Sequence, residues 1–192
     1  LCNKNKTIVM CNMRLEERLD EGKFVIEKMQ QSGYRISYLP TQDCLAEGGE
    51  FFYLPKENIL LAGLCRNNLK GAESMAELME VDQLHIIQSD GYHLDTAICP
   101  IFNDKYDCIG INCAREVFDD KNYNTLRDIC KKHSWELLDI ENQDMKKSLI
   151  ARSAMNCLTL PGLLIGTSPI NNKNIIDFTH QNNIQMHVAN VS

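Results

Sequence analysis

The sequence predicts an α/β protein built from repeated strand–strand–helix–strand modules, and two observations lead to this fold class. First, segments with the period of two that strands show alternate along the chain with segments whose apolar residues recur at helical spacing. Second, the strand that follows each helix begins near residues 35, 84, 135 and 184, so the intervals are 49, 51 and 49 residues. A fixed period near fifty residues is typical of repeat architectures, in which each module buries a face against its neighbours.

Modules that are rich in strands tend to close radially and to leave a central cavity, so we expect a propeller-like arrangement. The alternative is a set of four unrelated α/β units in one open sheet, which the equal spacing disfavours. The chain has 192 residues, of which 44% are hydrophobic and 24% are charged. This composition is typical of a soluble globular protein, and we expect residues 1–192 to form one domain.

The first two modules are predicted from residues 7 to 88. In the first, we expect a strand at 7–11, an amphipathic helix at 15–32 and a strand at 34–39, with Gly33 ending the helix. The apolar side of that helix comprises Leu15, Leu19, Val25, Ile26 and Met29. In the second module, we expect a hairpin at 50–54 and 58–64, a helix at 71–79 and a strand at 84–88.

The last two modules follow the same plan. The third has predicted strands at 95–102 and 106–112, a helix within 114–133 and a strand at 135–140. The fourth has predicted strands at 156–160 and 163–166, a helix near 173–181 and a strand at 184–191. The first module has one strand before its helix where the later ones have two, and the sequence stops after the last strand. We therefore expect that both ends are cut, are disordered or were lost in evolution, and the sequence leaves these alternatives open.

Composition also disfavours several classes of partner. The net charge is −6 and no run is rich in lysine or arginine, so we expect no nucleic acid partner. No apolar run is long enough to span a bilayer and no secretory pattern is present, so we expect no membrane partner. The nine cysteines are odd in number and include no Cys-x-x-Cys. They indicate buried thiols in a cytoplasmic protein rather than disulfides or a metal site, and we expect no cofactor.

The candidate chemistry lies in residues 91–97, which read Gly-Tyr-His-Leu-Asp-Thr-Ala. If this segment is extended, His93 and Asp95 point to one face, while Leu94 points the opposite way into the core. An imidazole can transfer protons near neutral pH, and a carboxylate beside it can orient a cation. The alternative is a surface histidine and aspartate at the mouth of a strand.

Three stretches together resemble a known family. They are residues 47–50 (Glu-Gly-Gly-Glu), residues 63–73 (Gly-Leu-Cys-Arg-Asn-Asn-Leu-Lys-Gly-Ala-Glu) and residues 93–96 (His-Leu-Asp-Thr). In this order and at this spacing they resemble the guanidino-group-modifying superfamily, which includes dimethylarginine dimethylaminohydrolase, arginine deiminase and the amidinotransferases. Residues 12–18 also resemble the strand-to-helix entry of this family. The resemblance implies a pentein fold, a five-bladed α/β propeller of ββαβ modules.

The resemblance also assigns roles to individual residues. His93 matches the general acid/base, which protonates the leaving amine and then activates water. Glu47 matches the acid that hydrogen-bonds the substrate guanidinium or orients the histidine, and Asp95 matches an acid that holds guanidinium nitrogens. Arg66 matches the arginine that the dimethylargininase branch places at the substrate's carboxylate. Glu50 stands where an aspartate is usual, and we expect it to keep a structural hydrogen bond.

The chemistry of a guanidino group agrees with these roles. A guanidinium is planar, permanently charged and rich in donors, so carboxylates are its natural complement. Its central carbon is a poor electrophile, so hydrolysis needs a strong nucleophile such as a thiolate, together with an acid for the departing nitrogen. In the superfamily the catalytic cysteine lies after the last strand, whereas the last cysteine here is Cys157, which we interpret as a buried strand residue. We therefore expect the nucleophile, and a carboxylate of the first blades, to be missing from residues 1–192.

The sequence thus predicts a hydrolase of the dimethylargininase type that acts on a small arginine derivative through a thiol-bound intermediate. The alternatives are an arginine deiminase, an amidinotransferase or a protein that binds guanidino ligands without catalysis. Arg66 favours the dimethylargininase branch, whereas the His-Leu-Asp-Thr motif fits the deiminases equally well. We further predict that Glu47, Arg66, His93 and Asp95 line one central cavity, because Glu47 and His93 open consecutive modules.

Overall fold

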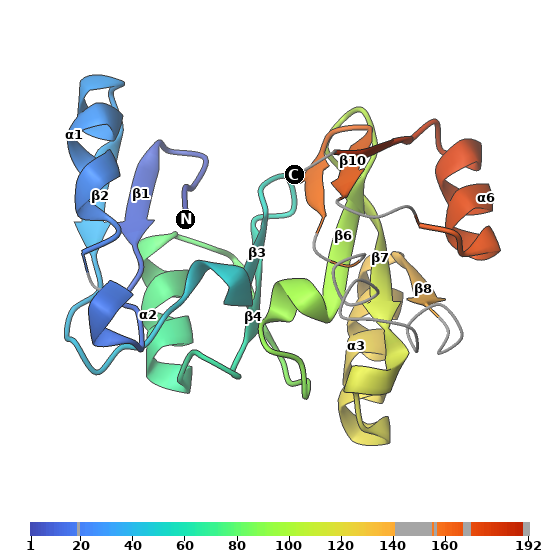
Figure 1. Ribbon diagram of the computed structural model, residues 1–192, viewed down its shortest axis with the longest axis horizontal. Helices are drawn as coiled ribbons and strands as arrows, with labels where there is room; N and C mark the ends of the chain where they lie inside the picture. Colours follow the sequence, from blue (N-terminus) through green and yellow to red (C-terminus); the bar gives the residue numbers. More distant parts are fainter. Residues whose placement is uncertain (19, 141–154, 156, 167–169, 190–192) are drawn as a thin grey trace. The chain divides into compact units, whose positions relative to one another are not determined.

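The computed structural model describes residues 1–18, 20–140, 155, 157–166 and 170–189. The chain divides into two compact units, Leu1–Ile86 and Ile87–Ser192. Each unit has a mixed α/β fold in which small sheets carry helices on their connections (Figure 1). Among the described residues, no helix has both the length and the hydropathy that crossing a membrane requires.

The first module of unit one pairs strand β1 (Thr7–Met10) in parallel with strand β2 (Arg35–Tyr38). Both predicted strands are confirmed. The helix between them is shorter than predicted, because residues Glu16–Arg18 form a separate 3-10 turn and α1 spans only Lys23–Gln31. Gly22 caps α1, and its poor helix propensity accounts for the late start.

The predicted apolar side of α1 is not buried within this unit, which corrects the sequence interpretation. No residue of α1 is fully buried, and the side chains of Leu15 and Val25 are each 45% exposed. Phe24 is 87% exposed. Leu19 lies outside the described residues. Helical spacing thus predicted the helix, but it did not predict which of its residues are covered.

The second module contains a three-stranded sheet in the order β3-β4-β5 (Phe51–Leu54, Ile59–Gly63 and Gln83–Ile87). Strands β3 and β4 form the predicted antiparallel hairpin. The connection from β4 to β5 is helix α2 (Leu69–Leu78), whose N-cap Asn68 accepts a hydrogen bond from the Gly71 amide at 2.8 Å. Met75 packs from α2 into the buried core of this unit.

Gly71 packs so closely that replacement by alanine is expected to destabilise the protein. A Cβ atom there would lie 1.9 Å from the Leu45 carbonyl oxygen. The Leu45 backbone is itself fixed, because its amide donates to the Asn68 side-chain oxygen and its carbonyl accepts from the Asn68 amide. Propensity alone predicts a gain of about 1 kcal/mol for alanine in a helix. The clash with backbone outweighs this gain, so we expect Gly71→Ala to lower the unfolding free energy by about 3 kcal/mol or more.

Urea denaturation measures this effect. The exposed Glu73 of the same helix provides a matched control, and Glu73→Ala is expected to change the unfolding free energy by less than about 0.5 kcal/mol. An unfolding midpoint of Gly71→Ala equal to that of the wild type would show that the close approach to Leu45 is not a constraint.

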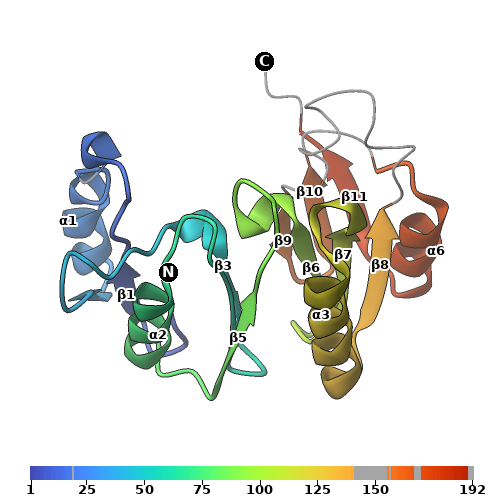
Figure 2. The same ribbon diagram turned by 90° about the horizontal axis from the view of Figure 1, so that it is seen from below.

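Unit two contains the third and fourth modules. The third has strands β6 (Ile98–Phe102), β7 (Cys108–Ala114) and β8 (Glu136–Ile140), with helix α3 (Asp120–His133) between β7 and β8. The fourth has strands β9 (Leu158–Leu160), β10 (Leu163–Gly166) and β11 (Gln185–Val188), with helix α6 (Lys173–Gln181) between β10 and β11. Figure 2 shows α3 and α6 beside their sheets.

Both modules of unit two repeat one topology. The first two strands of each are antiparallel, and the helix returns the chain to a third strand parallel to the second. The helices begin at Asp119 and Asn172, whose side chains accept hydrogen bonds from the first-turn amides. The predicted ββαβ modules are therefore confirmed, with boundaries within a few residues of the prediction. Closure of the modules into a propeller stays a prediction.

Candidate functional site

Glu47 begins the Glu-Gly-Gly-Glu segment of unit one, directly before a 3-10 turn over Gly48–Glu50. Its backbone is extended, and its amide donates a hydrogen bond of 2.7 Å to the Asn67 side chain. The residue is 1% exposed. An acid buried to this extent requires compensating donors.

The compensating groups are a backbone amide and an arginine, which donate hydrogen bonds, and a second arginine, which forms an ion pair. The Arg14 amide donates to Glu47 Oε1 at 3.1 Å. On the other oxygen, Arg18 Nη1 donates to Oε2 at 3.5 Å and Arg66 Nε lies 3.6 Å away. Within this unit the Glu47 carboxylate therefore sits among guanidinium groups supplied by the chain itself, and its surroundings suit planar cations.

Glu50 closes the same segment and is completely buried. Its Oε1 accepts a hydrogen bond of 2.6 Å from the Arg66 amide. The structural hydrogen bond that we expected of Glu50 is thus confirmed. Because Glu50 holds the backbone of Arg66 while Glu47 contacts its side chain, the two acids fix the start of the loop before α2.

A cavity of about 530 Å³ lies beside this segment in unit one. Its walls include Cys11, Arg18, Gly48 and Gly49. The volume lies within the range that small-molecule sites occupy. Arg18 thus contacts both the buried Glu47 and the open cavity.

The His-Leu-Asp-Thr motif of unit two is not extended, which corrects the sequence prediction. Leu94–Thr96 form a 3-10 turn, and β6 begins only at Ile98. The turn is held by the Thr96 hydroxyl, which donates to the His93 carbonyl at 2.7 Å. A hydroxyl three residues downstream can divert the backbone from a strand in this way. Leu94 is nevertheless fully buried, as predicted.

His93 and Asp95 remain close to one another despite the turn. His93 is partly buried, and its ring centroid lies 4.6 Å from that of Tyr92. Burial raises the pKa of the Asp95 carboxyl, and the nearby His93 partly opposes that rise. Asp95 Oδ1 is buried and has no hydrogen-bond donor within the described part of the chain. A buried carboxylate oxygen in this condition would be stabilised by a cationic ligand.

The raised pKa of Asp95 yields a prediction about stability. When the pKa of a carboxyl is higher in the folded protein than in the unfolded chain, the protonated form of that carboxyl stabilises the fold. This contribution to the unfolding free energy is lost as pH rises through the folded pKa. At pH 7 we therefore expect Asp95→Asn to raise the unfolding free energy slightly, by less than about 1 kcal/mol because solvent screens a partly buried group.

Urea denaturation of both proteins at pH 7 and near pH 4 shows whether Asp95→Asn raises or lowers the unfolding free energy. The advantage of asparagine should shrink at the lower pH, where Asp95 is itself protonated in a larger fraction of molecules. A variant that is less stable than the wild type at pH 7 would instead indicate that the protein already supplies a partner for the charged carboxylate.

Sequence reasoning missed Arg14 and Arg18 as partners of Glu47. The contacting residues are 33 and 29 positions apart in the sequence, so a local sequence pattern cannot predict these contacts. Asn67 was part of the quoted motif, but its bond to the Glu47 amide was not foreseen. Within the described ranges, no group of three or more histidine, cysteine or acidic side chains is arranged to hold a metal.

Neither a protein-family model nor a curated protein sequence matches the chain. Solved structures do. The N-terminal domain of ArgZ, an arginine dihydrolase from the ornithine–ammonia cycle in cyanobacteria, was solved with bound substrate and matches at a TM-score of 0.76 with 18% identity. That match covers 98% of this chain and 65% of the other. AgrE in a binary complex with L-arginine matches at 0.76 with 19% identity, over 98% of this chain and 27% of that chain.

A third match is the dimethylarginine dimethylaminohydrolase of Pseudomonas aeruginosa in complex with citrulline. Its TM-score is 0.68 at 14% identity, over 98% of this chain and 66% of the other. At such identities the likeness establishes the fold, a mixed α/β fold shared with these proteins. The chain spans about 65% of the length of the ArgZ domain.

Proposed function

We propose that the protein is a hydrolase that acts on the guanidino group of a small arginine derivative, in the manner of dimethylarginine dimethylaminohydrolase. The observation that carries this proposal is a buried carboxylate on one motif, Glu47, and a partly buried carboxylate on the other, Asp95. Glu47 is already surrounded by guanidinium groups, and Asp95 presents a buried oxygen without a donor in the described chain. The structural neighbours that act on or bind arginine and citrulline support the same substrate class.

In this proposal the two acids bind the substrate and His93 moves the proton. Asp95 and Glu47 accept hydrogen bonds from the guanidinium nitrogens, and the single positive charge of the substrate offsets the charge of Asp95, while Arg18 already lies beside Glu47. A cysteine thiolate, in the position after the last strand that the resemblance gives, attacks the guanidino carbon. His93 protonates the departing amine, and then removes a proton from the water that hydrolyses the thiol-bound amidino intermediate. One structural neighbour was solved with a covalently bound reaction intermediate.

The proposed role of Arg66 is to bind the substrate's carboxylate. In unit one its amide is fixed by Glu50, while its side chain is 18% exposed and lies against Glu47. A guanidinium group held in this way can form two parallel hydrogen bonds to a carboxylate. The Glu47–Arg66 contact would then have to open as the substrate arrives.

A second candidate is hydrolysis of arginine itself. The structures of ArgZ and AgrE match at TM-scores of 0.74 to 0.76, above the 0.68 of dimethylarginine dimethylaminohydrolase. The two candidates release different amines from their substrates. Dimethylarginine would yield citrulline and dimethylamine, whereas arginine would yield citrulline and ammonia.

The test is to incubate the protein at its natural length with each substrate and to quantify citrulline, dimethylamine and ammonia. Citrulline with dimethylamine supports the dimethylargininase type, and citrulline or ornithine with ammonia supports an arginine hydrolase. Failure to turn over either substrate, while arginine still binds in calorimetry, would favour a guanidino-binding protein without catalysis.

A further inference from the structure

Unit two contains a pair of thiols that the proposed function does not use. Cys99 is the second residue of β6 and is completely buried. Cys157 lies immediately before β9 and is partly exposed, which corrects its interpretation as a buried strand residue. The two side chains are hydrogen-bonded to each other, and neither belongs to a disulfide.

The backbone holds these thiols together. At one end of the contact between the strands, the Gly162 amide donates to the Phe102 carbonyl at 3.1 Å. At the other end, Cys157 meets Cys99. Both contacts advance in the same direction along the chain, so β9 runs parallel to β6. Figure 2 shows the two strands near each other. The contact between Cys99 and Cys157 thus results from the packing of the third module against the fourth.

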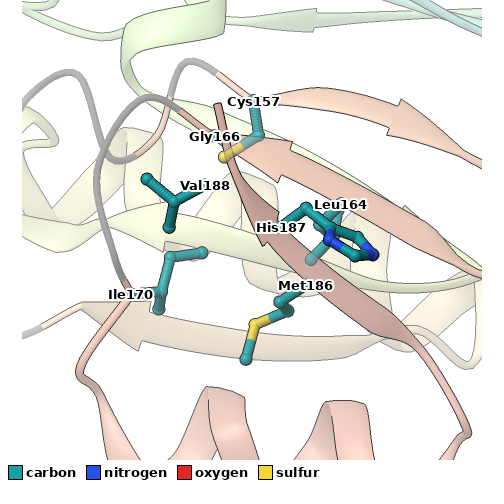
Figure 3. Close-up of a pocket in the computed structure, with 7 residues that line it drawn as sticks. All are labelled: Cys157, Leu164, Gly166, Ile170, Met186, His187 and Val188. Carbon is teal, nitrogen blue, oxygen red and sulfur yellow. The ribbon is translucent and has the colours of Figure 1, made fainter. Parts of the chain in front are cut away.

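Solvent reaches the two sulfur atoms unequally. Cys157 lines a cavity of about 200 Å³ together with Leu164, Met186 and His187 (Figure 3). Cys99 is fully buried and does not line this cavity. The hydrogen bond from Cys99 lowers the pKa of the Cys157 thiol, although burial opposes this, and it raises the pKa of Cys99 well above its usual value. A reagent that enters the cavity therefore meets the more thiolate-like sulfur first.

We propose that Cys157 is an oxidation site for hydrogen peroxide, and that Cys99 is its resolving thiol. The Cys157 thiolate attacks one peroxide oxygen, the O–O bond breaks, and a sulfenic acid forms as the second oxygen leaves and takes a proton to become water. The Cys99 sulfur then attacks the sulfenic sulfur and the S–O bond breaks. The hydroxyl leaves with the Cys99 proton as a second water. Two thiols have lost two electrons to the peroxide, and a Cys99–Cys157 disulfide remains.

The lining of the cavity favours an uncharged oxidant. Apart from His187, the side chains that surround Cys157 are apolar and include Leu164, Ile170 and Val188. Such walls admit hydrogen peroxide, whereas an anionic thiol reagent would lose hydration on entry without gaining a partner. Cys130 in α3 offers a useful contrast, because burial raises the pKa of its thiol to about 12.

The test uses the natural-length protein with hydrogen peroxide, followed by alkylation of the remaining thiols, intact mass and peptide mapping. Before alkylation we expect the intact mass to fall by about 2 Da, a change that dithiothreitol reverses, and after alkylation we expect a linked peptide pair that carries Cys99 and Cys157. Cys99→Ser should leave a Cys157 sulfenic acid that dimedone captures, and Cys157→Ser should abolish both products. Cys130→Ser should form the disulfide as the wild type does.

The peptide map of the oxidised wild-type protein tests the proposed Cys99–Cys157 disulfide even if a variant fails to fold. A Cys157 that stays alkylatable while other cysteines oxidise would overturn the proposal. A disulfide that joins Cys157 to a different cysteine would overturn it as well, as would an unchanged loss of about 2 Da in Cys99→Ser. None of these outcomes depends on turnover of an arginine derivative, so the proposed function can fail without affecting this test.

Discussion

Replacement of His93 by alanine is expected to lower turnover of the arginine derivative by roughly 10²–10⁴-fold, the contribution typical of a general acid/base. The amine leaves as a strongly basic group unless a proton is supplied, and alanine cannot supply one. Folding should change little, because the His93 side chain is only partly buried. Initial rates with arginine and dimethylarginine, together with urea denaturation, measure both effects.

His180 provides the matched control for this variant. It lies exposed in the last turn of α6, and His180→Ala is expected to leave turnover unchanged. If His93→Ala turned over every arginine derivative at the wild-type rate, His93 would not be the general acid/base.

Glu47→Gln is expected to reduce stability and turnover together. Glutamine keeps the shape of the side chain but removes the charge, so Arg18 and Arg66 would face each other without the acid between them. Loss of one partner from a buried ion pair typically costs several kcal/mol. Because Arg18 is 35% exposed and Arg66 is 18% exposed, we expect the lower part of that range, about 2–3 kcal/mol of unfolding free energy.

Urea denaturation in low and high salt tests this account of Glu47. The control is Glu21→Gln, which removes the exposed partner that Arg18 holds at 2.6 Å and should leave the unfolding midpoint nearly unchanged. Equal midpoints for Glu47→Gln and the wild type would mean that the buried carboxylate does not hold the two arginines in place.

Much of the fold could be predicted because its signals are local. The period near fifty residues follows from strand and helix patterns that each lie within one module, and three modules show the predicted ββαβ order. The errors occurred where a side chain competes with the regular backbone. The Thr96 hydroxyl turns the His-Leu-Asp-Thr motif into a 3-10 turn, and Gly22 delays the start of α1.

The candidate site was predictable only in part, because some of its contacts join residues that are far apart in the sequence. Glu47 and Glu50 lie within one recognisable motif, and the structure shows that both are buried. The guanidinium group of Arg18 reaches Glu47 across 29 residues, through the packing of unit one, and a sequence pattern does not encode such a contact. The thiol pair of Cys99 and Cys157 likewise depends on how β9 packs beside β6.

The central claim of the proposed function is that Glu47 and His93 act on one substrate. A crystal structure of the natural-length protein with bound dimethylarginine or arginine tests it most directly. The proposed function predicts guanidinium nitrogens within hydrogen-bond distance of Glu47 and Asp95, and a His93 imidazole within roughly 4 Å of the leaving nitrogen. A separation of more than about 12 Å between the Glu47 and His93 side chains would contradict it, because one small ligand could not engage both.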